Sequence, residues 1–256
     1  MVAAAVGRPG EEDELFAAQG DSEAFQGRLT QAREWQRKAV DSARRDGDLE
    51  TAASYYLDAA IQEAETGNIG EVPREVDAGL ALGAGRDIQI EAALALARIG
   101  DAARAQTVSD DLRREHPNDT LLVHYWLPTV QASMELQKGS PAPALDLLQT
   151  TAPYIFSTDL WGAMLYPVYL RGEAFLAAHD AKAAITEFQK LIAGRFFVAN
   201  GTVVVLAHLG LGRAYAMAGE EDKARAEYKE FLTLWKDADP DIPVLKQARA
   251  EYAKLP

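Results

Sequence analysis

The stretch AHLGLGRAYAMAGEEDKARA, residues 207–226, decides the fold of this chain. Small and apolar residues recur at helical spacing on both sides of Gly219, which predicts two helices joined by a tight turn. A helix hairpin of this length cannot bury its apolar face alone. We therefore expect further copies of the hairpin elsewhere in the sequence.

The hairpin recurs about six times along the 256 residues, at intervals of 33 to 40 residues. Ala or Gly fills eleven of the twelve positions that lie seven residues before or five residues after a turn, although these two residues make up only about a quarter of the chain. Small side chains there allow paired helices to approach closely. The turn residues are Gly27, Gly67, Gly100, Gly139, His179 and Gly219. The flanking small positions are Gly20, Ala60, Ala93, Ala132, Gly172 and Gly212, then Ala32, Val72, Ala105, Ala144, Ala184 and Ala224.

The spacing indicates a repeat architecture, since the shortest interval is close to the 34-residue unit of the tetratricopeptide repeat. We expect an all-α, right-handed tetratricopeptide superhelix (an α-solenoid) over residues 11–256, after an N-terminal tail or linker at 1–10. A last helix at 243–254 has the polar face of a C-terminal cap. The predicted helix pairs are 11–26 with 29–44, 50–65 with 70–82, 88–99 with 102–115, 120–138 with 142–148, 166–178 with 181–192, and 204–218 with 221–235.

Composition excludes several classes of partner. The formal net charge of −13 opposes binding to nucleic acid and to anionic lipid, so neither is expected. No run of about 18 apolar residues occurs, so direct membrane insertion is not expected. The chain has no Cys, which excludes disulfides, Cys-ligated zinc and a Cys nucleophile.

No catalytic, cofactor or metal motif stands out. The four histidines are scattered without ligand spacing, and the segment from Gly210 to Gly212 lies inside a predicted helix with no strand before it. We therefore expect a chain that is not an enzyme and that needs no cofactor or metal. Helix-dipole complementation explains acidic clusters at predicted helix starts better than calcium binding does.

The inner face of the predicted superhelix supplies the candidate partner-binding residues. Aromatic side chains beside a charged pair are typical of binding hot spots and could anchor an extended segment. The alternative is that these aromatics pack against neighbouring helices or loops. The candidate anchors are Trp126, Tyr166, Tyr169, Glu173, Arg213 and Met217. The repeat register adds Ser54, Leu57, Ile61, Ile90, Leu94, Thr129, Ser133 and Leu209 to the same face.

Four strings carry a family resemblance. They are GRDIQIEAALALARIGDAARAQ (85–106), HYWLPT (124–129), YPVYLRGEAFLAAHD (166–180) and EFLTLWKDADPDIPVLKQARAEYAKL (230–255). They resemble the C-terminal tetratricopeptide region of bacterial eukaryotic-like serine/threonine protein kinases, over nearly the whole chain from about residue 11. In that family a kinase domain and a membrane helix come first, which implies tethering to a membrane protein on the extracytoplasmic side. Related regions also follow winged-helix regulators, so the resemblance leaves the attached output domain open.

The kinase motifs themselves do not occur in this sequence: it has no Gly-rich nucleotide loop, no His-Arg-Asp and no Asp-Phe-Gly. Our leading hypothesis is therefore a non-catalytic protein- or peptide-binding module, the sensing or scaffolding region of a signalling kinase. A second hypothesis is a small-molecule sensor with a pocket between the aromatic loops 151–165 and 194–202. A third is self-association of two copies.

Overall fold

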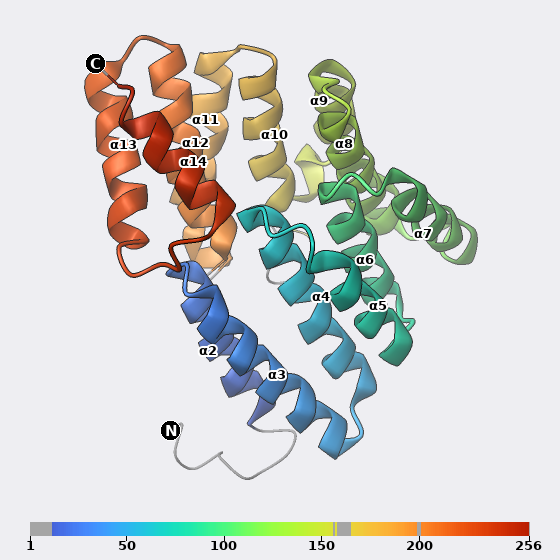
Figure 1. Ribbon diagram of the computed structural model, residues 1–256. Coiled ribbons are helices and arrows are strands. Elements are labelled where there is room, and N and C mark those ends of the chain that lie inside the picture. Colours follow the sequence, from blue (N-terminus) through green and yellow to red (C-terminus); the bar gives the residue numbers. More distant parts are fainter. Residues whose placement is uncertain (1–11, 156, 158–164, 199–200, 256) are drawn as a thin grey trace.

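The computed structural model describes residues 12–155, 157, 165–198 and 201–255, and this part of the chain is all-helical, as predicted (Figure 1). No helix in these ranges is both long and apolar enough to cross a membrane. The predicted tail at 1–10 lies outside the described residues. The α-helices are α2 (Asp13–Phe25), α3 (Leu29–Asp46), α4 (Leu49–Thr66), α5 (Val72–Leu82), α6 (Arg86–Arg98), α7 (Ala102–Glu115), α8 (Leu127–Gln137), α9 (Pro141–Gln149), α10 (Tyr166–Ala177), α11 (Ala181–Ala193), α12 (Thr202–Met217), α13 (Glu221–Leu234) and α14 (Pro243–Tyr252).

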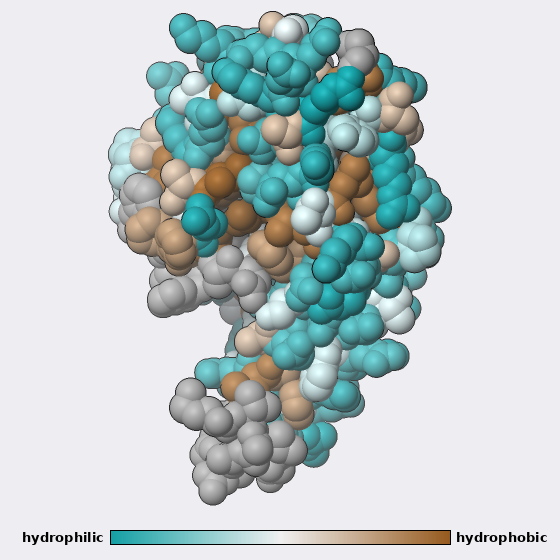
Figure 2. All heavy atoms as spheres, turned by 90° about the vertical axis from the view of Figure 1, so that its left-hand side faces the viewer, coloured by the Kyte–Doolittle hydropathy of each residue, from teal (hydrophilic) through white to brown (hydrophobic). Residues whose placement is uncertain are grey.

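Consecutive helices form six hairpins, from α2 with α3 to α12 with α13, within the described ranges (Figure 1). The first helices of successive hairpins also contact one another, from α4 through α6, α8 and α10 to α12. The helices α4, α6, α8, α10 and α12 therefore make one continuous row, which we call the inner row, and α2 contacts its last member, α12. Figure 2 shows one side of the molecule, where hydrophobic residues gather in the upper part among a mostly polar surface.

The predicted turn and packing positions behave as the repeat requires. All six turn residues have positive φ, including His179 at 59°, in the left-handed region that glycine enters most easily. All twelve flanking positions are buried. A Cβ added to Gly172 would come within 2.5 Å of the Phe188 ring, and one added to Gly212 within 2.7 Å of the Tyr228 ring. The small residues thus permit the close helix contacts.

The first helix of the fourth hairpin contains an irregularity that the repeat does not predict. Residues 120–137 are helical, in agreement with the predicted helix over 120–138, but Leu122–Trp126 form a π-helical turn directly before α8. Pro128, at the start of α8, has no N–H to donate to the carbonyl of His124, which favours such an irregularity. The Thr150 hydroxyl lies 3.4 Å from that carbonyl oxygen, but its shorter hydrogen bond, at 2.7 Å, goes to the carbonyl of Leu147.

The last helices return to the first hairpin and close the row. The Trp235 side chain is fully buried and donates its indole N–H to the Phe25 carbonyl at 3.0 Å. The Asp239 carboxylate accepts from the backbone N–H of Thr30 at 2.7 Å and from its hydroxyl at 2.9 Å. Helix α14 packs on α13 and on α4 of the second hairpin, so the last helix also contacts an element far from it in sequence (Figure 1).

Candidate functional site

The aromatic residues predicted as groove anchors are core residues. Trp126 is 0% exposed, Tyr166 2% and Tyr169 6%. Trp126 packs edge-on against Tyr125 with ring centroids 4.8 Å apart, and Tyr169 packs against Phe188 at 6.2 Å. Trp126 and Tyr169 thus pack in the core in place of lining an open groove, which is the alternative that the sequence left open. Tyr166, although buried, also borders the cavity described below.

The other predicted anchors do not form one surface with these rings. Glu173 pairs with Arg98 at 2.8 Å, and Arg213 pairs with Glu251 of α14 at 2.9 Å. Met217 is 41% exposed near the end of α12. Trp126 belongs to a hydrophobic cluster separate from that of the two tyrosines. The six residues are thus spread over different environments.

The Arg98 side chain on α6 pairs with carboxylates of two other helices. Its guanidinium lies 2.6 Å from a carboxylate oxygen of Glu65 on α4 and 2.8 Å from one of Glu173 on α10. The Tyr166 hydroxyl donates to the same Glu65 carboxylate. The Glu65 side chain is only 1% exposed. We call these four residues the Arg98 cluster; every charge in it has an opposite partner, as buried charges require.

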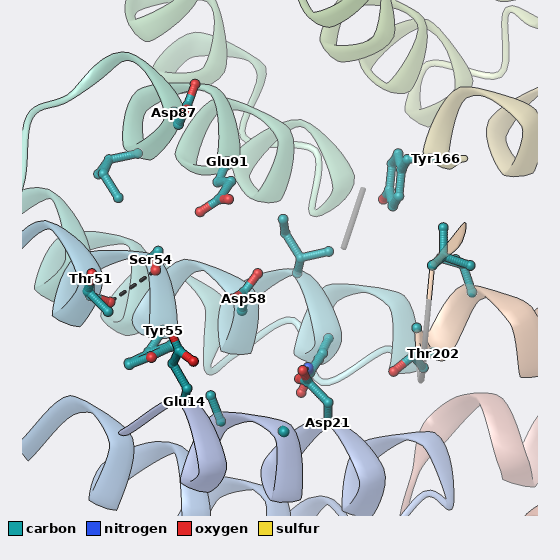
Figure 3. A pocket seen from close by; sticks show the side chains of 18 of the residues that line it. Glu14, Asp21, Thr51, Ser54, Tyr55, Asp58, Asp87, Glu91, Tyr166 and Thr202 are labelled. Atoms are coloured by element: carbon teal, nitrogen blue, oxygen red, sulfur yellow. Dashed lines mark hydrogen bonds between the residues drawn. The ribbon is translucent and has the colours of Figure 1, made fainter. Parts of the chain in front are cut away.

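A cavity of about 730 Å³ opens on the inner row, between α2, α4 and α6 (Figure 3). Tyr166 of α10 and Thr202 at the start of α12 line its other side. Carboxylates dominate its charge: seven acidic residues face one arginine, Arg86, among the lining residues. The acidic residues are Glu14, Asp21, Glu50, Asp58, Glu65, Asp87 and Glu91.

Helical spacing explains how α4 faces the cavity. Thr51, Ser54, Asp58, Ile61 and Glu65 follow one another at intervals of three or four residues, so they share one face of the helix. The predicted inner positions Ser54, Ile61 and Tyr166 do line the cavity.

On α6 the predicted inner face was displaced by one residue. Ile90 and Leu94 are core residues, whereas Asp87, Ile88 and Glu91 line the cavity. One residue corresponds to a rotation of about 100° around a helix. A signal for the missed acids existed: Asp58 and Glu91 each lie nine residues before their turn glycine.

Burial raises the pKa of three cavity carboxylates, and in two of them a neighbouring carboxylate adds to the shift. The surrounding protein, with a smaller contribution from Asp21, raises the pKa of Asp58 from 3.8 to about 7. Burial, and then Asp58 and Asp87, raise the pKa of Glu91 well above its usual value. Burial also raises the pKa of Asp21, although a 2.8 Å hydrogen bond from Gln62 opposes it. We call Asp21, Asp58 and Glu91 the acidic triad.

The arginine that lines the cavity, Arg86, and the arginine that pairs with the lining residue Glu65, Arg98, both have carboxylate partners. Arg86 pairs with Asp119 at 2.6 Å and with Asp87. Arg98 is held in its own cluster by Glu65 and Glu173. No cation contributes to the pKa shifts of the triad. Among the described residues, the triad therefore has no positive partner.

The cavity also contains polar atoms without a hydrogen-bond partner in the described structure. Thr202 is 6% exposed and its hydroxyl has no partner, and neither does the Glu91 Oε2 oxygen. In Figure 3 the Glu91 and Asp58 side chains point toward each other across the space, and the Thr202 oxygen points into it. Buried polar atoms without a partner are unusual in folded proteins, and a ligand can satisfy them.

Apolar groups complete the lining. Ile61 and Ile88 contribute from α4 and α6, and Val198 and Val203 from the opposite side. Phe197 also lines the cavity while half exposed, which places it at the opening, and its neighbour Phe196 is 81% exposed. The predicted pocket between the aromatic loops involves residues 156, 158–164 and 199–200, which lie outside the described part; the second loop instead borders this cavity.

Comparisons with known proteins do not assign a role to this cavity. The chain matches no protein-family model and no curated protein. Within the described residues, no three His, Asp or Glu side chains converge closely enough to hold a metal ion. The chemistry of the lining residues is thus the guide to function.

Proposed function

We propose that this chain is a non-catalytic helical-repeat module of the tetratricopeptide type, which binds a segment of a partner protein in the cavity between α2, α4 and α6. The observation that carries the proposal is the position of the cavity on the inner row of first helices. In tetratricopeptide arrays that face holds peptides. The resemblance to kinase-associated repeat regions supports a sensing or scaffolding role within a larger signalling protein.

A small-molecule sensor is the second candidate. A volume of about 730 Å³ falls within the range of roughly 300–1,000 Å³ that is common for small-molecule sites. The mixed lining of apolar, hydroxyl and carboxylate groups also suits a compact ligand. A metabolite that raises the melting temperature without any added protein would favour this candidate.

The test is selection of peptides from a random display library on the full chain. Ala18 is exposed and lines the cavity, so Ala18→Trp partly fills the space with little disturbance of the core. Ala142, exposed on α9 outside the cavity lining, supplies the matched control Ala142→Trp. We expect the selected peptides to lose about tenfold or more in affinity for Ala18→Trp and to bind the control normally.

Two outcomes would contradict the proposal. Peptides that bind both variants equally would place the binding site elsewhere on the surface. Failure to select any peptide would leave the small-molecule sensor as the candidate for the cavity. Melting curves of both variants establish beforehand that each is folded.

A further inference from the structure

The acidic triad calls for a compensating charge from outside the chain. Burial raises the pKa of all three carboxylates, Asp21 adds to the shift of Asp58, and Asp58 adds to that of Glu91. None of the arginines and lysines of the described residues forms an ion pair with them in this structure. Close like charges in a desolvated space destabilise the empty protein. A bound cation would turn that repulsion into attraction and would gain from the low local polarity.

The unpartnered polar atoms show what the cation must offer. The Thr202 hydroxyl and the Glu91 Oε2 oxygen can each accept a hydrogen bond. An ammonium has three donors and a guanidinium has five, so either group can reach several acceptors at once. A bare metal ion fits less well, because the described oxygen ligands do not converge on one point.

Apolar groups in the same cavity indicate the rest of the ligand. Ile61, Ile88 and Val203 lie among the carboxylates, and Phe197 stands at the opening. Lysine and arginine side chains have this build, with a methylene stem that packs on apolar surface and a charged end. The exposed Phe196 beside Phe197 offers further apolar contact outside the cavity.

We infer that the cavity between α2, α4 and α6 recognises an organic cation, an ammonium or guanidinium group on an apolar stem, whose charge lies against Asp21, Asp58 and Glu91. This inference names the ligand class of the site proposed above and so rests on that function. The same chemistry has two sources, a Lys or Arg side chain of a partner protein and a free amine or guanidine. The experiment must therefore separate them.

The test is calorimetric titration of the full chain at pH 8 and low ionic strength. One probe is an octapeptide with a central Lys-Phe in a Gly-Ala background; its partners carry Arg or N-acetyl-lysine in place of the Lys. Cadaverine and agmatine serve as free cations. We expect the Lys or Arg peptide to bind, and acetylation to weaken binding about tenfold or more, because it removes the charge.

Isosteric variants locate the charge that matters. Asp58→Asn and Glu91→Gln each remove one triad charge, whereas Asp146→Asn removes one exposed charge on α9, outside the cavity lining. We expect about tenfold weaker cation binding for each triad variant and no change for the control. If Asp58→Asn raises the melting temperature and weakens binding, the carboxylate serves a ligand at a cost in stability. If Asp58 were a purely structural residue, Asp58→Asn would lower the melting temperature and leave binding unchanged.

The outcomes separate this inference from the proposed function. Equal binding of the acetylated and unmodified peptides, equal loss in Asp58→Asn and Asp146→Asn, or no binding of any cation would overturn the inference. Selected peptides without a charge could bind the parent chain and Asp58→Asn equally but fail to bind Ala18→Trp. That result would support the binding module and refute the recognition of a cation. Cadaverine or agmatine binding without any peptide binding would uphold the cation and refute the protein-segment module.

Discussion

Helix α4 presents two carboxylates on one face, seven residues apart, that meet opposite fates. Glu65 lies in the Arg98 cluster, where burial raises its pKa but Arg98 and the Tyr166 hydroxyl oppose that shift and satisfy the carboxylate. Asp58 lies in the cavity, where desolvation and Asp21 raise its pKa to about 7. No cation among the described residues contributes to this shift. Both sites include α4 and α6, and Glu65 itself also lines the cavity. A buried carboxylate is therefore not by itself a sign of a binding site. A buried carboxylate that has no cationic partner within the fold is a better indicator.

The largest effect is expected when Glu65 loses its cationic partner, Arg98. Arg98→Met leaves Glu65, 1% exposed, without its guanidinium partner. We expect the free energy of unfolding to fall by about 3–5 kcal/mol, as for other buried ion pairs that lose one member. Urea denaturation measures it. The control Arg104→Met opens an exposed pair with Asp77 and should change stability by less than about 1 kcal/mol. Equal losses in the two variants would remove the distinction.

A second test concerns the aromatic residues predicted to anchor a partner. Trp126 is fully buried, so Trp126→Ala should lower the free energy of unfolding by about 3 kcal/mol or more through cavity formation. The protein that remains folded should keep its peptide affinity. Met217→Ala, a change at an exposed position, should do little to stability. A Trp126→Ala variant that is stable but no longer binds would restore the predicted groove.

Removal of a carboxylate charge from the cavity, in contrast, should stabilise the protein. Asp58→Asn keeps the shape of the side chain and removes a repelled charge, so we expect a gain of about 1–2 kcal/mol at pH 8. Denaturation of the variant beside Asp146→Asn measures it, since both lose one negative charge. A loss of stability in Asp58→Asn would mean that this carboxylate has a favourable contact of its own.

The smallest effect, and the most specific, is the pH dependence of that gain. In the folded chain Asp58 holds its proton up to about pH 7, whereas unfolded it releases the proton near 3.8. The folded state then binds more protons than the unfolded state across this window, so the contribution of Asp58 to stability falls as pH rises from about 4 to about 7.

The difference between Asp58→Asn and the parent chain should therefore be small near pH 4 and reach its full value by about pH 8. Asp21 and Glu91 titrate with Asp58, which broadens the transition but does not change its sign. Urea denaturation of both proteins across this range measures the difference. A difference that is constant with pH would show that Asp58 has the same pKa in the folded and unfolded chain.

Much of the fold could be predicted from local pattern. The six turn residues, the small residues beside them and most helix bounds follow from the repeat, because close helix packing and positive φ restrict residue type. The π-helical turn before α8 was missed because the repeat predicts an uninterrupted helix there. Docking of Trp235 on Phe25 joins residues 210 positions apart, a distance over which helical periodicity carries no information.

The candidate site was harder to predict for two physical reasons. A one-residue error in register turns a side chain about 100° around its helix, which exchanged Ile90 for Glu91. The acidic triad also draws on α2, α4 and α6, and in a chain with 39 acidic residues no single one of them stands out. The sequence predicts the aromatic residues as binding residues because large rings are common both in protein cores and in binding sites.

The contact between the last helices and the first hairpin changes how this molecule should come apart. A linear stack of hairpins has two free ends, and it can fray from either one because each repeat is held only by its neighbours. Here Trp235 and Asp239 join the ends through Phe25 and Thr30. Opening any one hairpin must first break contacts on both of its sides. Unfolding should then be a single cooperative event. Because the cavity would be lost when any part of the chain unfolds, binding of a partner would depend on the folding of the entire chain.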